Sequence, residues 1–349
     1  MQQRSNNIMF EKVRAILSAD EIKIRMPLDI AMKKLKEERD ALVKDIIAGR
    51  DKRTLFIIGP CSADNEDAVC DYASRLARVA DKVKDKLILM PRIYTNKPRT
   101  RGEGYKGMLH SPDPRKGTDI QAGIMAIRNM HLRVISESGL TGADEMLYPD
   151  NFAYLDDVLS YVAVGARSVE NQQHRLVASG IDVPVGLKNS MNGSLTVLAN
   201  SIYAAQLPNE FKYGNNQVRT NGNEYAHAIL RGSVDIFGNN LSNYHFEDII
   251  KFYNIYGEQG LKNPAIVIDT NHSNSGKNPF EQRRIVREVM SNMRADKRIA
   301  SLVKGFMVES YIADGNQDAN GGVYGKSITD ACIGWEKTES LIYEVADNL

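Results

Sequence analysis

The chain has 349 residues, and its 45 Lys and Arg side chains almost balance its 44 Asp and Glu side chains, which leaves a formal net charge of +1. A balanced charge gives no overall field that would attract nucleic acid or an acidic membrane surface, so we expect neither partner. Three cysteines are too few for the disulfide framework of a small secreted domain. The N-terminus, Met1–Phe10, lacks the apolar segment of a signal peptide, and no apolar run approaches the roughly 20 residues that span a bilayer. We therefore expect a cytoplasmic protein.

Residues 1–50 are predicted to form an N-terminal extension before the main domain, residues 51–349. Ser18 and Glu21 have the spacing of a capping box and predict the start of a short helix. Asp29–Ala48 places its apolar residues broadly on one side and is followed by Gly49, which predicts a helix with a glycine cap. Two compatible interpretations stay open: the helix closes the bottom of the main domain, or the extension is a regulatory or oligomer-forming arm.

The rest of the chain alternates short apolar runs with helical segments. Eight runs end at, or just before, a charged or metal-binding residue: Leu55–Ile58 (then Cys61), Leu87–Pro91 (Arg92), Thr141–Asp144 (Glu145), Tyr161–Ala166 (Arg167), Val183–Leu187 (Lys188), Ala226–Leu230 (Arg231), Ile266–Asp269 (His272) and Val303–Val308 (Glu309). Predicted helices follow at Asn65–Ala80, Ile120–Ser138, Asn151–Leu159, Ser168–Ser179, Gly193–Ala205, Phe246–Gly257, Phe280–Met293 and Thr329–Asn348. Strands that alternate with helices predict a parallel sheet. Eight such units, without a dinucleotide-type glycine fingerprint on the first, predict an α/β fold of the (β/α)8 TIM barrel class.

The C-terminal strand ends of such a barrel form one rim, where barrel enzymes hold their active sites. Three loops on the predicted rim are too long to be plain connectors: Ile93–Thr118, Gln206–Glu224 and Ala313–Ser327. The second loop is polar and is predicted to carry an extra hairpin or short strand. The pattern therefore predicts one active site surrounded by functional loops.

Six cations fall on this rim: Arg92, Lys97, Arg99, Arg167, Lys188 and Arg231. Each one alone is typical of a solvent-exposed charge, but Arg167, Lys188 and Arg231 end runs that should be buried on both faces. Buried cations need anionic partners because desolvation is costly without them, and guanidinium groups match phosphate and carboxylate. The cluster predicts a substrate with more than one anionic group.

Two further features of the rim are polar. Pro98 stiffens the turn from Lys97 to Thr100, which offers two cations and a hydroxyl to a single phosphate. Glu145 stands among the cations, where it would orient one of them or bind water.

A second set of rim residues combines sulfur, nitrogen and oxygen donors: Cys61, His272, Glu309 and Asp330. They follow strands one, seven and eight, which are neighbours in a closed barrel. Such a donor set suits one divalent first-row metal ion: Mn, Fe, Co or Zn. Taken alone, Cys61 is typical of a small buried hydrophobe and His272 of a core histidine, but the convergence of all four residues favours a metal site. Cys70 and Cys332 lie on predicted helices and are expected to pack in the core.

These residues lie within motifs that resemble one family, the type I 3-deoxy-D-arabino-heptulosonate 7-phosphate (DAHP) synthases of the enterobacterial-like branch. The matching motifs are Ile58-Gly-Pro-Cys-Ser62, Lys97-Pro-Arg-Thr100, Gly165-Ala-Arg167, Gln173-His-Arg175, Pro184-Val-Gly-Leu-Lys-Asn189, Ile229-Leu-Arg-Gly232, Ile268-Asp-Thr-Asn-His-Ser-Asn-Ser275, Met307-Val-Glu-Ser310, Gly315-Asn-Gln317 and Gly325-Lys-Ser-Ile-Thr-Asp-Ala-Cys-Ile-Gly-Trp335. The resemblance runs from about residue 12 to the C-terminus. The closing eleven-residue block and the ordered set of motifs are together highly specific.

The resemblance implies an enzyme that condenses phosphoenolpyruvate with erythrose 4-phosphate and releases phosphate, which opens the shikimate route to aromatic amino acids. It implies that Cys61, His272, Glu309 and Asp330 bind the metal ion. It implies that Arg99 and Thr100 hold the aldose phosphate and that Asp269 lines the site near the metal. It implies that phosphoenolpyruvate is surrounded by Arg92, Lys97, Glu145, the backbone of Ala166, Arg167, Lys188 and Arg231. Family members are dimers or tetramers, which implies a homodimer or homotetramer here.

The chemistry of this reaction agrees with the residues on the rim, because two phosphates and a carboxylate account for six cations. Polarisation of the aldehyde by the metal ion would let C3 of phosphoenolpyruvate attack it. Lys97 is the candidate acid for the developing alkoxide. The water that adds at C2 has two candidate activators: Glu145 together with Lys188, or the metal ion. We predict that Lys97, Glu145, Lys188 and His272 are the catalytic residues.

The regulatory parts depart from the family pattern. Members that phenylalanine or tyrosine inhibits use a pocket near the fourth and fifth units together with acidic residues of a neighbour's N-terminal arm. Here the arm has Ser5-Asn6-Asn7 without acids, Ile181-Asp182 stands where a small hydroxyl residue is usual, and Gln206–Glu224 is shorter than usual. We therefore predict an enzyme that aromatic amino acids do not inhibit, or one that is regulated differently.

Three alternatives stay open. A 3-deoxy-octulosonate phosphate synthase would use another aldose, but that group favours a longer Asn-containing motif over Lys-Pro-Arg-Thr. A secondary-metabolic enzyme for an aminated or otherwise altered tetrose is barely separable by sequence. A catalytically dead barrel that serves as a binding partner is disfavoured because every ligand and cation position is filled.

Overall fold

The computed structural model describes residues 10–99 and 101–349, so the expectations for Thr100 and Ser5-Asn6-Asn7 lie outside the described residues. One sheet of 8 parallel strands has the neighbour order β2-β1-β12-β11-β8-β5-β4-β3. The strands are β1 (Thr54–Gly59), β2 (Leu87–Pro91), β3 (Gly142–Glu145), β4 (Leu159–Val164), β5 (Val185–Lys188), β8 (His227–Leu230), β11 (Ile266–Asp269) and β12 (Val303–Glu309). All the predicted strands are present, and the (β/α)8 barrel is confirmed.

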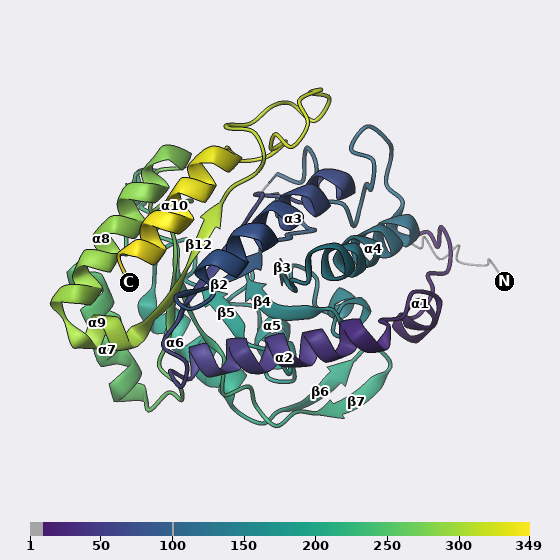
Figure 1. Cartoon of the computed structure of the whole chain (residues 1–349). Coiled ribbons are helices and arrows are strands. Elements are labelled where there is room, and N and C mark those ends of the chain that lie inside the picture. Colours follow the sequence, from purple (N-terminus) through teal and green to yellow (C-terminus); the bar gives the residue numbers. More distant parts are fainter. Residues whose placement is uncertain (1–9, 100) are drawn as a thin grey trace.

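Helices cover the outside of the barrel (Figure 1): α3 (Glu66–Val83), α4 (Ile120–Ser138), α5 (Gln172–Ala178), α6 (Leu195–Gln206), α7 (Phe246–Gln259), α8 (Gln282–Ala295), α9 (Lys297–Leu302) and α10 (Trp335–Asp347). Alternate side chains of a strand point to opposite faces. In β1, Phe56 and Ile58 therefore join the outer core under the helices, whereas Leu55 and Ile57 join an inner core within the barrel. Burial on both faces explains why the strands are continuous apolar runs rather than alternating ones.

The N-terminal extension packs on one end of the barrel. Helix α1 (Ala19–Arg25) starts with the predicted capping box, in which the Ser18 hydroxyl accepts from the Glu21 backbone and the Glu21 carboxylate accepts from the Ser18 backbone. Helix α2 (Ile30–Ile47) runs across the lower end of the barrel in Figure 1, and its Val43 and Ile46 side chains belong to the inner core. Gly49 follows with φ +73°, the left-handed conformation expected of a glycine cap.

The seam between β2 and β3 closes the barrel with few backbone contacts. Arg92 and Ala143 form an isolated bridge, and the Ile93 N–H donates to the Ala143 carbonyl at 2.8 Å. The buried Asp144 carboxylate completes the seam, because it accepts from the Thr95 N–H at 2.9 Å and from the Thr95 hydroxyl. The same carboxylate accepts from the backbone N–H of Glu145 at 2.7 Å. One side chain thus ties the loop after β2 to the end of β3.

Several helix predictions need correction. The helix predicted at Asn151–Leu159 is wrong: the segment forms a 3-10 turn, η1 (Pro149–Tyr154), and Leu159 already begins β4. Too few residues separate β3 from β4 for a full crossover helix. The segments predicted at Ser168–Ser179 and Thr329–Asn348 are helical only in α5 and α10, because the residues before each helix form rim loops.

The rim carries additional elements. The loop Gln206–Glu224 contains the predicted hairpin, made of β6 (Glu210–Tyr213) and β7 (Asn216–Arg219). The hairpin of β9 (Ser233–Val234) and β10 (Asn240–Leu241), the turn η2 (Pro279–Glu281) and helix α9 were not predicted. Within the described part of the chain, we find no helix with the length and apolarity that crossing a membrane requires.

His227 of β8 predicts a specific acid sensitivity of the fold. The ring is fully buried; Nε2 lies 2.8 Å from the Tyr161 hydroxyl and Nδ1 lies 2.8 Å from the Tyr225 carbonyl. Burial lowers the pKa of His227 to about 4. An unfolded histidine titrates near about 6.5, so the unfolded chain binds more protons between these values and stability is lost as the pH falls through this window.

We expect the substitution His227→Gln to remove this contribution. We expect this in urea denaturation as the pH is lowered from 6 to 5. The unfolding free energy of the unsubstituted protein should fall more than that of the variant, by about 1 kcal/mol per pH unit. Equal slopes for the two proteins would contradict a buried, neutral His227.

Candidate active site

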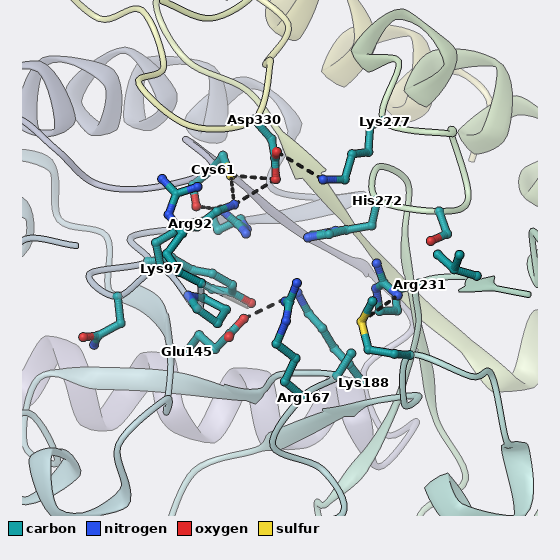
Figure 2. Close-up of a pocket in the computed structure, with 18 of the residues that line it drawn as sticks. Cys61, Arg92, Lys97, Glu145, Arg167, Lys188, Arg231, His272, Lys277 and Asp330 are labelled. Atoms are coloured by element: carbon teal, nitrogen blue, oxygen red, sulfur yellow. Dashed lines mark hydrogen bonds and ion pairs between the residues drawn. The ribbon is translucent and has the colours of Figure 1, made fainter. Parts of the chain in front are cut away.

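The strand ends and rim loops enclose a cavity of about 270 Å³. Most of the predicted site residues line it together (Figure 2): Cys61, Arg92, Lys97, Arg99, Glu145, Ala166, Arg167, Lys188, Arg231, His272 and Asp330. Glu309 and Asp269 are buried, and they contact cavity residues without being part of the lining. The structure therefore brings the predicted cations and the predicted metal ligands to one place.

Three of the predicted metal ligands converge. Cys61, Glu309 and Asp330 each offer one ligand atom, and these atoms lie within 4.8 Å of one another. Cys61 follows β1 and Glu309 ends β12, and these strands pair so that Gly59 lies opposite Glu309. The loop before α10 brings Asp330 to the same place, with its Oδ2 atom 3.6 Å from the Cys61 sulfur. Cys61, Glu309 and Asp330 thus form a possible metal site.

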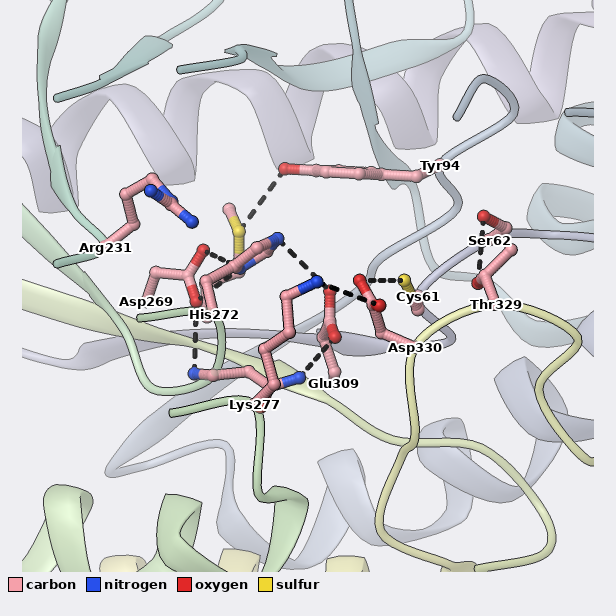
Figure 3. Close-up of polar contacts among 12 residues, drawn as sticks. Cys61, Ser62, Tyr94, Arg231, Asp269, His272, Lys277, Glu309, Thr329 and Asp330 are labelled. Atoms are coloured by element: carbon pink, nitrogen blue, oxygen red, sulfur yellow. Dashed lines mark hydrogen bonds and ion pairs between the residues drawn. The ribbon is translucent and has the colours of Figure 1, made fainter. Parts of the chain in front are cut away.

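His272 lies beside this group (Figure 3). Its Nε2 atom is 3.8 Å from a Glu309 carboxylate oxygen, and its Nδ1 atom is 2.9 Å from Asp269 Oδ2. A carboxylate on the outer nitrogen is the usual way in which proteins orient a metal-binding histidine. Asp269 lies behind His272 rather than in the cavity wall, so it contacts the site through other residues. The sulfur, nitrogen and oxygen donors of this set fit a first-row divalent ion.

Charge compensation keeps the carboxylates of this set ionised. Burial would raise the pKa of Glu309, but His272 and Arg92 lower it. Burial would likewise raise the pKa of Asp330, but the Lys97 ammonium holds it well below its usual range. The thiol behaves differently, because burial and the Glu309 carboxylate raise the pKa of Cys61.

Lys97 connects the donor set to the cation cluster. Its Nζ atom lies 2.8 Å from the Cys61 sulfur and 2.8 Å from Asp330 Oδ2. Burial would lower the pKa of Lys97, but Cys61 and Asp330 outweigh burial and the pKa is raised. The ammonium group therefore stays charged at neutral pH. Arg99, on the same loop, donates from Nε to the Tyr105 carbonyl at 2.8 Å.

The other cations that line the cavity form a cradle, in which Lys188 and Arg231 are buried, whereas Arg167, expected to be buried, is exposed to solvent. Lys188 Nζ lies 3.6 Å from Glu145 Oε2 and 3.4 Å from Asp269 Oδ2. Burial lowers the pKa of Arg231. Lys188 and Arg231 keep 5% or less of their surface exposed, so an anion that reaches them meets little competing water.

Arg92 has several partners within the protein. Its Nη1 atom donates to the carbonyls of Pro60 and Cys61, and its Nη2 atom lies 3.1 Å from Glu309 Oε1. Its guanidinium also stacks on the Tyr94 ring, 3.6 Å from the ring centroid. Arg92 thus orients Glu309 as well as facing the cavity.

Sequence reasoning missed several lining residues: Tyr94, Asn96, Pro98, Met191, Val234, Asn240, Ser273 and Lys277. Tyr94 stands two positions after Arg92, a spacing that places both side chains on one side of an extended segment, and this signal was available in the sequence. Val234 and Asn240 come from the β9–β10 hairpin, which had no such signal. Lys277 follows a quoted motif by two residues, and its role depends on the path of the loop.

The fold and the site define a (β/α)8-barrel enzyme whose C-terminal rim carries a cation-rich cavity and a possible metal site. The chain belongs to the DAHP synthetase I family, whose family model matches residues 26–342. It is 35% identical over 354 residues to the Tyr-sensitive phospho-2-dehydro-3-deoxyheptonate aldolase of Escherichia coli K12, covering 99% of this chain and 96% of that relative. The phospho-2-dehydro-3-deoxyheptonate aldolase of Corynebacterium glutamicum is 34% identical over 329 residues, with 90% and 86% covered.

A solved structure is also similar. The phospho-2-dehydro-3-deoxyheptonate aldolase of Francisella tularensis SCHU S4 superposes with a TM-score of 0.90 at 28% identity, covering 98% of each chain. The similarity therefore extends over the whole barrel and the extension.

Substitution of Asp144 tests whether its hydrogen bonds at the β2–β3 seam hold the rim loop that carries Lys97. Asp144→Ala leaves the buried N–H groups of Thr95 and Glu145 without their acceptor, so we expect the unfolding free energy to fall by about 2–4 kcal/mol. Hydrogen exchange should accelerate in the loop that carries Lys97. Asp144→Asn is the matched control, because its amide oxygen still accepts both N–H groups and it should lose less than about 1 kcal/mol. Equal losses in the two variants would show that these hydrogen bonds do not hold the loop.

Proposed function

We propose that this chain is a DAHP synthase, a transferase that condenses phosphoenolpyruvate with D-erythrose 4-phosphate and water. The products are 3-deoxy-D-arabino-heptulosonate 7-phosphate and phosphate, and the reaction is the first step of the shikimate route. The observation that carries the proposal is one cavity in which a sulfur, nitrogen and oxygen donor set faces a cradle of cations, of which Arg92, Lys188 and Arg231 are buried. Membership of the DAHP synthetase I family supports the same reaction.

The cation cradle is proposed to bind phosphoenolpyruvate. Arg167, Lys188 and Arg231 line one cavity, in which Lys188 and Arg231 are buried and Arg167 is exposed to solvent. There the phosphate and carboxylate of one small molecule would both be neutralised. Ala166 and the buried Arg92 line the same cavity. For the aldose phosphate we propose Arg99, and Thr100 by the family motif alone.

One divalent ion, Mn, Fe, Co or Zn, is proposed to be held by Cys61, His272, Glu309 and Asp330. When bound, such an ion would supply Lewis acidity toward the aldehyde of the aldose. The chain's own contribution is to orient the donors: Asp269 holds the His272 ring and Arg92 holds the Glu309 carboxylate.

Two groups are proposed to move protons. The Lys97 ammonium remains charged and stands between the donor set and the cradle, where it can give a proton to an oxygen that becomes negative. Glu145 is proposed to position the water that adds at C2. Its Oε1 atom is buried and has no hydrogen-bond partner among the described residues, while Oε2 lies 3.6 Å from Lys188 Nζ. Glu145 can therefore accept a hydrogen bond from a water molecule in the cradle.

Association into a homodimer or homotetramer in the cytoplasm is also proposed. The extension exposes apolar side chains at Phe10, Val13, Ile24 and Ile30, each at least 79% exposed. Apolar groups gathered on one segment at this level of exposure are typical of a surface that another subunit covers.

Insensitivity to aromatic amino acids is proposed from the departures in sequence. The relatives include enzymes named Tyr-, Phe- and Trp-sensitive, from which this chain would differ. Polar groups around the β6–β7 hairpin are already paired: the Tyr213 hydroxyl donates to the Pro149 carbonyl at 2.9 Å, and the hydroxyls of Thr220, which follows β7, and Ser179, which follows α5, lie 2.7 Å apart. Asp182 lies on the surface, where it accepts from Lys44 at 3.0 Å.

A phosphate-release assay tests the reaction and the metal separately. We expect phosphate release only when both phosphoenolpyruvate and erythrose 4-phosphate are present, with loss of activity in EDTA and recovery on addition of Mn²⁺. Cys61→Ala should abolish activity and weaken Mn²⁺ binding, while circular dichroism shows an intact fold. Absence of turnover after metal reloading would refute the reaction, and full turnover after thorough chelation would refute the metal assignment alone.

The same assay tests regulation. We expect millimolar phenylalanine, tyrosine or tryptophan to leave more than half of the activity, because Ser5-Asn6-Asn7 offers no acidic group to bind the ammonium of an amino acid. Strong inhibition by any of the three would refute insensitivity.

A further inference from the structure

Lys277 is a cavity residue to which neither the sequence motifs nor the proposed reaction gives a role. It lies on the loop after β11, five residues beyond His272, and its side chain enters the cavity wall (Figures 2 and 3). Its Nζ atom lies 3.5 Å from Asp330 Oδ1, and 61% of the side chain is exposed. The ammonium therefore faces both the donor set and solvent.

The backbone at Lys277 is unfavourable for a lysine. Its φ angle is +64°, in the left-handed region that glycine and asparagine adopt far more readily than residues with a longer side chain. Its N–H donates to the His272 carbonyl at 2.8 Å, and His272 itself has φ +48°. Such conformations persist where the surrounding structure fixes them, and they gather at functional sites. The strained backbone therefore marks Lys277 as a candidate functional residue, and the contacts of its side chain decide the matter.

The surrounding loop fixes this geometry through amide side chains. Asn274 donates to the carbonyls of Leu230 at 3.1 Å and Asp269 at 2.8 Å, and Asn271 donates to the Glu309 carboxylate. The loop is therefore held against β8, β11 and β12 at once. Lys277 is delivered to the cavity by a segment with little freedom to place it elsewhere.

The position of Lys277 relative to the other cations indicates its partner. Lys188 and Arg231 are almost fully buried, and Lys97 keeps only 13% of its side chain exposed, so these cations serve the deep part of the cavity. Lys277 stands on the solvent side of the donor set, beyond Asp330. A molecule that approaches Asp330 from the solvent side therefore meets this ammonium. Among the described residues its ammonium has one ion pair, the long contact with Asp330, and an ammonium with three N–H donors can still donate to an incoming group.

We propose that Lys277 binds the second substrate, a phosphorylated and hydroxylated aldehyde, and holds it over the donor set. The inference rests on the proposed function, because it assigns a contact to the aldose phosphate of that reaction. An ammonium suits this ligand since it can donate to phosphate and to hydroxyl oxygens alike. Phosphoenolpyruvate, held in the cradle, does not need this contact.

Kinetics with Lys277→Met and Lys277→Arg test the assignment, with Mn²⁺ saturating. Removal of one charge-assisted contact at a partly exposed site predicts a rise of about tenfold in KM for erythrose 4-phosphate. KM for phosphoenolpyruvate should stay within about twofold, and the arginine variant should recover part of the loss. Lys106→Met is the matched control, because Lys106 is exposed on another rim loop outside the cavity lining, and it should change neither KM.

Lys277→Asn separates binding from structure. Asparagine suits the left-handed backbone, so its Tm should equal or exceed that of the unsubstituted protein while KM for erythrose 4-phosphate still rises. If KM for erythrose 4-phosphate rises only in variants whose Tm has also fallen, the inference is overturned. Comparison of erythrose with erythrose 4-phosphate shows whether the phosphate or the hydroxyls make the contact.

Two outcomes distinguish this inference from the proposed function. If Lys277→Met is active with unchanged KM for erythrose 4-phosphate, or changes only the affinity for Mn²⁺, Lys277 merely orients Asp330 and the inference fails while the function stands. If the unsubstituted protein shows no turnover, the function fails. Calorimetric binding of erythrose 4-phosphate to the Mn²⁺- and phosphoenolpyruvate-loaded protein then tests Lys277 directly, and equal affinities with and without the lysine would overturn the inference.

Discussion

Compensation of buried charge is the constraint on which the rest of this site depends. A cation or carboxylate that leaves water without a partner is strongly destabilising, so each must be paired or must meet an ionic ligand. Arg92 pairs with Glu309, Lys188 with Asp269, and Lys97 with Asp330. These pairs join the strand ends of both halves of the barrel, and they hold the donors and the cradle in fixed relative positions. The same pairs leave a cavity in which Arg92, Lys188 and Arg231 are already desolvated and can face an anion with little competing water.

The barrel supplies the rigidity that such charges need. Continuous apolar strands, an inner core and helix α2 across the lower end leave the C-terminal rim as the place where polar groups can gather. The β2–β3 seam is the weak point of the sheet, and Asp144 strengthens it at the level of Thr95 and Glu145. The Asp144 carboxylate thus helps to close the barrel and to hold the loop that carries Lys97.

The loop after β11 shows a different compromise. His272 and Lys277 both adopt left-handed backbone, and amide hydrogen bonds from Asn271 and Asn274 keep them there. Both residues adopt a backbone conformation that non-glycine residues disfavour, and in this conformation an imidazole and an ammonium group reach the same donor set. Such a loop is held by hydrogen bonds between its amide side chains and the strand ends.

The sequence by itself determined the strands, the rim and most of the site. Strands buried on both faces must be apolar throughout, so a charged residue at the end of such a run, as at Lys188 or Glu309, marks the rim. It could not determine the crossover after β3, where the short distance to β4 excludes the helix that the pattern at Asn151 predicts. Only the tertiary structure placed Asp269 behind His272, turned Arg92 toward Glu309 and brought Lys277 to the cavity. Those contacts join residues far apart in the chain, or depend on the path of a strained loop, and neither leaves a periodic signal in the sequence.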